Sequence, residues 1–277
     1  MKYLKGLIDI IYFITYLFRD RKNSIRILIY HDIKTKIQKE LFQNQINALS
    51  KKYDFISPKE FEDIIKKGKV KGKKILLSFD DGFKSNRIVA ESILNKYGIK
   101  ALFFIISDFF DLNTHSLTYN KIIKNIYPNG PKLDELSEPM NRDDIQFLIN
   151  TGHSIGCHTA THKMLSKIIE TSELNKELIQ SKDHLEKTFN IKIKHIAFPF
   201  GTFKSIDMKS LKVLTKNYQF VHSGLRGNNI KNHQLLFRDA SNPEMKITRL
   251  KAFLLGNADF IYKNKFKTFK SFLIDTI

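Results

Sequence analysis

The feature that most constrains this chain is a pair of adjacent carboxylates, Asp80 and Asp81, directly after an apolar run. The run at 75–77 predicts a buried strand that ends at the pair. Two carboxylates this close do not both stay ionised in a half-buried cleft unless a cation or a proton lies between them. We therefore expect a metal ion here, with its other ligands supplied from elsewhere in the chain.

Two histidines four residues apart, His158 and His162, offer such ligands. Residues at this spacing share one face of a helix, and in a tight loop they also converge. Two neutral imidazoles and one carboxylate leave open positions on a divalent ion, which is typical of a catalytic site rather than a structural one. The spacing alone is also that of chance surface pairs, so the interpretation depends on the neighbouring carboxylates.

Segments with strand and helix patterns alternate along the chain, which predicts one α/β domain with a mainly parallel sheet, barrel-like or doubly wound. The expected strands are 26–30, 74–79, 101–106, 154–157, 195–198, 219–222 and 235–238. The expected helices are 42–53, 58–67, 84–97, 143–151, 171–189 and 206–216. Residues 111–140, rich in proline and glycine, predict an irregular insertion over a cleft. The acidic pair and the histidines follow expected strands, where ligands bind in such folds.

The charge of the chain suggests an anionic partner. A net charge of +19 over 277 residues favours a nucleic acid, an anionic membrane or a negatively charged substrate, although a solvated lysine surface is the simpler alternative. No nucleic-acid-binding motif is present, so we expect no nucleic-acid partner. The single cysteine, Cys157, excludes an internal disulfide.

Both ends of the chain are basic and apolar. An apolar run at 7–18 is shorter than the ~20 residues of a membrane-spanning helix and lacks the small-residue site of a cleavable signal peptide. Either both ends are interfacial anchors on anionic lipid, or they are ordinary helices packed on the domain. We divide the chain into an amphipathic segment at 1–24, a central domain at 25–240 and a basic helical segment at 241–277. The expected location is cytoplasmic, peripheral on the inner face of the membrane.

The motifs S-F-D-D-G at 78–82 and H-T-A-T-H at 158–162 resemble, in order and spacing, those of the polysaccharide deacetylase family. This family is also called carbohydrate esterase family four and contains the NodB-homology domain. The segment F-P-F-G at 198–201 is similar to the family's Pro-Tyr-Gly loop, and G-H-S-I-G at 152–156 also matches. The resemblance spans about residues 25–238 and implies an irregular (β/α) barrel of the NodB-homology type with mainly parallel strands.

The resemblance implies a role for each matching residue. Asp81, His158 and His162 would ligate a divalent metal, usually Zn²⁺, and Asp80 would act as the general base. The metal would lower the pKa of a water molecule and polarise the acyl oxygen. The loop formed by Pro199, Phe200 and Gly201 would contact the substrate and supply a backbone N–H to the developing oxyanion.

Amide hydrolysis also needs an acid that protonates the leaving amine. The motif Y-H-D at 30–32 looks like the early Tyr-His motif of the branch that deacetylates exopolysaccharide, so we expect His31 to be this acid. Ala197 stands where the family often has an arginine that orients the base. We expect Arg238 to replace it beside the substrate-binding loop. A purely structural ion pair of Arg238 is the alternative.

The expected activity is hydrolysis of a linear amide bond, the N-acetyl or N-formyl group of an amino sugar. The substrate would be a surface glycan or its lipid-linked precursor, and the basic ends favour a lipid-phosphate-linked sugar at an anionic membrane. One alternative is an extracytoplasmic deacetylase of polymeric N-acetylglucosamine or peptidoglycan. Another is a catalytically silent glycan- or membrane-binding protein. The sequence leaves the sugar and the oligomeric state open.

Overall fold

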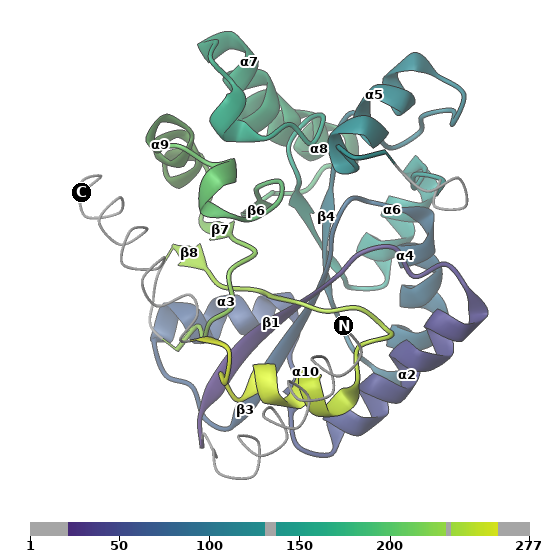
Figure 1. Cartoon of the computed structure of the whole chain (residues 1–277), viewed down its shortest axis with the longest axis vertical. Helices are drawn as coiled ribbons and strands as arrows, with labels where there is room; N and C mark the ends of the chain where they lie inside the picture. The colour runs from purple at the N-terminus through teal and green to yellow at the C-terminus, as the bar shows by residue number, and fades with distance from the viewer. Residues whose placement is uncertain (1–21, 131–136, 231–233, 260–277) are drawn as a thin grey trace.

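The computed structural model describes residues 22–130, 137–230 and 234–259. Its core is one curved sheet in the order β8-β7-β6-β5-β4-β3-β1-β9, with β2 paired to β3 off this path (Figure 1). Among the described residues every strand pair is parallel, which confirms the predicted α/β barrel with mainly parallel strands. The strands are β1 Ser24–Tyr30, β2 Asp54–Phe55, β3 Lys73–Phe79, β4 Leu102–Ile105, β5 Ser154–Cys157, β6 His195–Ala197, β7 Phe220–His222, β8 Leu235–Leu236 and β9 Asp239–Ala240.

Helices connect the successive strands from β1 to β7 and surround the sheet (Figure 1). The α-helices are α2 Lys36–Ser50, α3 Pro58–Lys67, α4 Lys84–Val89, α5 Leu117–Ile126, α6 Arg142–Asn150, α7 Thr171–Asn175, α8 Ser181–Phe189, α9 Met208–Asn217 and α10 Ile247–Leu254. The π-helical turns are η1 Ala90–Leu94 and η4 Lys176–Gln180, and the 3₁₀ turns are η2 Asn95–Tyr97, η3 Leu165–Lys167 and η5 Phe203–Ser205.

Local capping explains the best-predicted helix. The Ser57 side chain accepts a hydrogen bond from the backbone N–H of Glu60, Pro58 occupies the first turn, and Gly68 ends α3 with φ of 63°. Two predicted helices, 84–97 and 171–189, have the expected ends but are interrupted by η1 and η4. The segment 111–140, expected to be the least regular part of the chain, contains one helix that was not predicted, α5, which begins under an N-cap from Ser116.

Alternation along the strands sorts side chains between the helices and the barrel interior. Tyr30, Phe79 and Phe103 are register partners on β1, β3 and β4, and their rings stack in the core shared with α2. The neighbouring positions face the interior, where Phe104 packs with Leu102 and Ala197. This alternation, continued past the end of β3, places Asp80 on the inner face.

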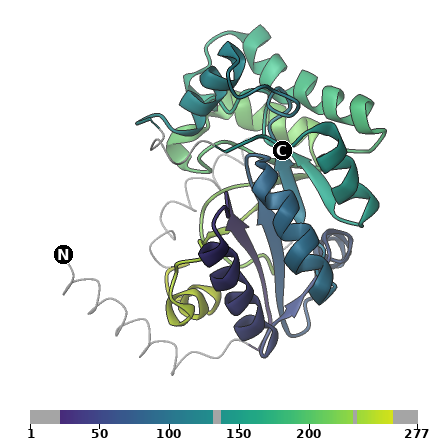
Figure 2. The ribbon, with the colours of Figure 1, turned by 90° about the vertical axis from the view of Figure 1, so that its right-hand side faces the viewer.

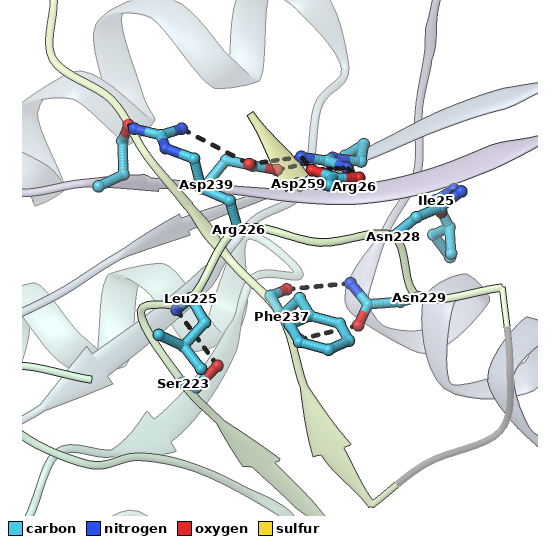
Figure 3. Close-up of polar contacts among 11 residues, drawn as sticks. Ile25, Arg26, Ser223, Leu225, Arg226, Asn228, Asn229, Phe237, Asp239 and Asp259 are labelled. Atoms are coloured by element: carbon cyan, nitrogen blue, oxygen red, sulfur yellow. Dashed lines mark hydrogen bonds and ion pairs between the residues drawn. The ribbon is translucent and has the colours of Figure 1, made fainter. Parts of the chain in front are cut away.

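The two edges of the sheet are β8 and β9, and a loop joins the segment between them to the start of β1 at this seam of the barrel (Figure 3). Asn228 accepts a hydrogen bond from the backbone N–H of Ile25 at 2.9 Å. Asn229 donates to and accepts from the backbone of Phe237 at 2.9 Å. The loop thereby fixes the segment that carries Arg238 against the start of β1.

The described part of the predicted C-terminal segment packs on the body of the domain. Helix α10 lies beside α2 in both views (Figures 1 and 2). Buried Arg26 on β1 pairs with Asp239 at 2.5 Å and with Asp259 at 3.0 Å. Of the predicted terminal segments 1–24 and 241–277, residues 1–21 and 260–277 lie outside the described residues. No helix in the described ranges is long and apolar enough to span a membrane.

Candidate metal centre and active site

The predicted site residues follow the carboxyl ends of parallel strands. His31 follows β1, the pair Asp80 and Asp81 follows β3, and His158 follows β5. The loop at 199–201 follows β6, and Arg238 lies between β8 and β9. Because all these strands are parallel, their carboxyl ends form one edge of the barrel. The topology therefore gathers residues that are far apart in the sequence at this edge.

Asp81 and the two histidines form a compact, buried group of possible metal ligands. Oδ1 of Asp81 lies 3.5 Å from Nε2 of His158 and 3.5 Å from Nε2 of His162. One ligand atom from each residue lies within 4.8 Å of the other two. Each residue is at most 4% exposed, so the three atoms define one protected point.

Backbone carbonyls fix the orientation of both imidazoles. Nδ1 of His158 donates to the carbonyl of Ala197 at 2.7 Å, and Nδ1 of His162 faces the carbonyl of Asn125 at 3.4 Å. When these rings are neutral with Nδ1 protonated, the lone pair of each is on Nε2, which points at Asp81. The backbone carbonyls orient the two imidazole rings. Two imidazole nitrogens and one carboxylate oxygen then suit a divalent ion such as zinc with open coordination positions.

The electrostatics of the group favour the binding of a cation. Burial alone would raise the pKa of Asp81, but hydrogen bonding to His158 and the charge of His162 hold this pKa far below its usual value. Burial and the charge of His158 lower the pKa of His162 to about 4. The anionic carboxylate and the neutral His162 are the protonation states that bind metal.

Asp80 is held away from this point by Arg238. Nη1 and Nη2 of the guanidinium bind Oδ1 and Oδ2 at 2.7 and 2.9 Å. Arg238 is itself fixed by the carbonyl of Ser223 at 3.0 Å and lies over the ring of Phe104. Burial by itself would raise the pKa of Asp80, but the charges of Arg238 and His158 outweigh it and lower this pKa. Asp80 is therefore an ionised carboxylate beside the predicted metal ligands.

The loop after β6 forms one wall of the site. Phe200 has φ of 62°, and its ring lies 5.1 Å from that of His162. Gly201 has φ of 59°, and a Cβ there would lie 2.2 Å from the backbone nitrogen of Gly224. Pro199 has no N–H, and that of Gly201 donates to Phe198 at 3.2 Å. Within the described structure, the N–H of Phe200 is the donor of this loop that has no acceptor.

His31 lies at the rim of the site. It is exposed to solvent, and the preceding Tyr30 accepts the backbone N–H of Asp80 at 3.0 Å. The charge of His31 contributes to lowering the pKa of both Asp80 and Asp81, which places it within electrostatic reach of the pair. The next residue, Asp32, is anchored by Ser85 at 2.5 Å and by Ser137.

Sequence reasoning missed one residue that shapes the site, Glu177. Its buried carboxylate accepts the backbone N–H groups of Ala160 and Thr161 at 3.0 and 2.9 Å and the hydroxyl of Thr161. These bonds stabilise the loop between the two histidines, where His162 has φ of 59°. Glu177 belongs to η4. Its contact with the histidine loop spans more than 15 residues of sequence, so no local sequence spacing predicts it.

Comparison with known proteins agrees with this geometry. A family profile described as polysaccharide deacetylase matches residues 67–218, more than half of the chain. The chain belongs to the polysaccharide deacetylase family.

A curated relative is the poly-β-1,6-N-acetyl-D-glucosamine N-deacetylase of Staphylococcus aureus. It is 29% identical over 191 residues, which cover 66% of this chain and 60% of that protein. The chain spans about three fifths of the length of the curated relatives that it matches.

Two solved structures share the fold. The Streptococcus pyogenes deacetylase PplD, in complex with acetate, has a TM-score of 0.66 at 21% identity, covering 83% of this chain and 98% of that one. IcaB from Ammonifex degensii has a TM-score of 0.66 at 18% identity, covering 84% of this chain and 97% of that one. At these identities the likeness concerns the fold.

Proposed function

We propose that this protein is a metal-dependent N-deacetylase that hydrolyses the N-acetyl or N-formyl group of an amino sugar. One observation carries the proposal: the ligand atoms of Asp81, His158 and His162 converge on one point, and Asp80, held ionised by Arg238, lies beside them. Membership of the polysaccharide deacetylase family supports the same reaction class.

Asp81, His158 and His162 would hold the metal, and their mixed nitrogen and oxygen donors favour zinc. When bound, such an ion supplies a Lewis acid that lowers the pKa of water and polarises the acyl oxygen. No described residue other than these three forms a comparable group of ligands.

The remaining chemistry belongs to side chains and backbone. Asp80 accepts a proton from water as the water oxygen adds to the acyl carbon, using a lone pair that Arg238 leaves free. The N–H of Phe200 is free to donate to the oxyanion that forms on the acyl oxygen. As the carbon–nitrogen bond breaks, His31 donates a proton to the nitrogen, releasing the amine and the carboxylic acid.

The substrate is proposed at two levels. The class is an N-acetylated amino sugar, because this class appears in the name of the Staphylococcus aureus relative. The finer proposal is a lipid-phosphate-linked precursor at the cytoplasmic face of an anionic membrane, supported by the net charge of +19 and the basic ends of the sequence. The relative's name favours the other candidate, a polymer of N-acetylglucosamine.

Acetate release tests the proposal. Purified protein is assayed on N-acetylglucosamine oligomers and on N-acetylglucosamine linked through diphosphate to a short prenyl chain, with and without chelator. We expect zinc-dependent acetate release, lost with chelator and restored by added metal. Protein that binds zinc but releases no acetate from any of these sugars contradicts catalysis and supports the silent glycan-binding alternative.

Binding to vesicles tests the proposed location separately. The full chain is floated with vesicles of neutral lipid and with vesicles containing anionic lipid, at low and high salt. We expect binding that depends on anionic lipid and weakens as salt rises. The absence of binding to anionic vesicles at low salt contradicts a peripheral membrane location and leaves the polymer as the better candidate.

A further inference from the structure

The candidate metal site adjoins a cavity, most of whose lining residues have no role in the proposed reaction. The cavity has a volume of about 410 Å³, within the range of small-molecule sites. It lies between α5, the loop after β5 and the start of α7, the elements at the top of Figure 1. His162 and Phe200 belong both to its lining and to the site. A substrate whose amide reaches Asp80 therefore has room to continue into this cavity.

One part of the lining is apolar. Met164, Ile168 and Phe200 line the cavity together with Pro128. Phe200 is held by its contact with the ring of His162. The flat, weakly polar face of a pyranose ring packs on aromatic and aliphatic side chains of this kind, so the wall suits a sugar unit beside the one that is deacetylated.

The charged part of the lining is basic. Three lysines, Lys124, Lys163 and Lys167, line the cavity with a single carboxylate, Glu173. Lys163 is paired with Glu173, which neutralises that pair. Among the residues that the structure describes, Lys124 and Lys167 have no ion-pair partner. Lys124 belongs to α5 and Lys167 to the end of η3.

The excess of positive charge in this cavity does not follow simply from the basic composition of the protein. A second cavity, of about 500 Å³, is lined by Lys84 and by two carboxylates, Asp111 and Glu138. Lys84 there is paired with Glu138 at 3.1 Å. Asp111 is paired with Arg142 at 3.3 Å. Both carboxylates of this second cavity are therefore neutralised, whereas the cavity that shares residues with the metal site carries excess positive charge.

We propose that this cavity binds an anionic unit of the substrate, with a phosphate or carboxylate group between Lys124 and Lys167 and the sugar ring on the wall formed by Met164, Ile168 and Phe200. This inference rests on the proposed function, because it extends the same substrate. The site selects amino sugars that carry or adjoin a negative charge over neutral oligomers. The source of the charge is a phosphate-linked precursor or an acidic neighbouring sugar.

The test compares matched charge variants in a binding assay. Lys124→Gln/Lys167→Gln removes two charges at the cavity, and Lys66→Gln/Lys67→Gln removes two exposed charges at the end of α3. Each is made in the Asp80→Asn background, so that substrates bind without turnover. The probes are a neutral N-acetylglucosamine tetramer, a tetramer alternating N-acetylglucosamine with glucuronate, and N-acetylglucosamine 1-phosphate.

We expect the cavity variant to bind at least one anionic probe about five- to tenfold more weakly, as two exposed charge pairs imply, and the neutral tetramer unchanged. The more affected probe identifies phosphate or carboxylate as the group recognised. The proposal is overturned if both pairs of variants weaken anionic binding equally, if the neutral tetramer is weakened as much, or if no probe is affected. The experiment measures the binding of probes. Its outcome therefore tests the anionic subsite independently of the acetate-release assay that tests the proposed function.

Discussion

Arg238 binds both carboxylate oxygens of Asp80, with nitrogen–oxygen distances of 2.7 and 2.9 Å in the buried interior of the barrel. The resemblance to the family implies an arginine that orients the base at a position before the Pro-Tyr-Gly loop, and this position is Ala197 here. Ala197 instead uses its carbonyl to orient His158 at 2.7 Å. The contact that orients the Asp80 carboxylate therefore comes from the segment between β8 and β9.

Replacing Arg238 should reduce activity through the position of Asp80. Arg238→Lys keeps the positive charge but loses the bidentate contact with both carboxylate oxygens of Asp80. We therefore expect kcat to fall about 10- to 100-fold with metal content unchanged. Arg238→Gln leaves a buried carboxylate without its cation and should cost about 3–5 kcal/mol of unfolding free energy. Acetate release and urea unfolding measure the two effects.

The double variant Asp80→Asn/Arg238→Gln is the control for this pair. It removes both charges, so it should recover much of the stability lost in Arg238→Gln. If Arg238→Lys has wild-type kcat, the arginine is a structural ion pair and does not position the base.

Glu177 should act on the metal site through the loop that it holds. Glu177→Ala removes the acceptor for two backbone N–H groups and the hydroxyl of Thr161, and we expect zinc affinity to fall about 10- to 100-fold. Glu177→Gln should stay within about threefold, because an amide can accept both N–H groups and donate to the threonine hydroxyl. Zinc titration measures both, and equal affinities of the alanine and wild-type proteins would contradict the assignment.

His31 should matter only where the leaving group needs a proton. His31→Gln is expected to lower kcat on an N-acetylated sugar at least about 100-fold. On p-nitrophenyl acetate, whose leaving group departs without protonation, the same variant should stay close to wild type. Rates on both substrates, with zinc content measured on the same sample, make the comparison. Equal losses on both would assign His31 to some role other than proton donation.

Stability should fall in mild acid through His153. Burial, with a smaller effect from Lys100, lowers its pKa to about 4, compared with about 6.5 in an unfolded chain. Its Nδ1 accepts the backbone N–H of Ala101 at 3.1 Å, which requires an unprotonated Nδ1. Between these pKa values the unfolded state binds more protons, so stability decreases as pH falls from about 6.5 to 4, by at most about 1.4 kcal/mol per pH unit.

His153→Asn isolates this contribution, since an amide oxygen can accept the same N–H at any pH. Urea unfolding at several pH values should show a shallower loss of stability below pH 6.5 in the variant, whatever its stability at pH 7. Parallel profiles for the two proteins would show that His153 does not titrate in this window.

The sequence predicted what depends on local pattern. Three local signals were informative: the apolar run before Asp80, the proline and glycine at the two ends of α3, and the spacing of His158 and His162. The structure brings the acidic pair and the histidines together at one edge of the sheet. Helix α5 was not predicted, because the proline and glycine residues at 128–131 indicated a loop and outweighed the N-cap signal at Ser116.

Long-range contacts could not be predicted in this way. The bonds from Glu177 to the histidine loop depend on how η4 packs against that loop. The ion pair between Arg238 and Asp80 joins residues 158 positions apart. It depends on the loop at the barrel seam, where Asn229 holds the neighbouring Phe237. Such pairings follow from tertiary packing and leave no periodicity in the sequence.

The most direct test of the central claim compares the two adjacent carboxylates. Asp80→Asn and Asp81→Asn are purified with zinc, and metal content and acetate release are measured on the same samples. The account predicts that Asp80→Asn retains zinc but releases acetate at least about 100-fold more slowly, whereas Asp81→Asn loses zinc itself. Zinc-loaded Asp80→Asn protein that releases acetate at the wild-type rate would contradict the assignment of Asp80 as the base.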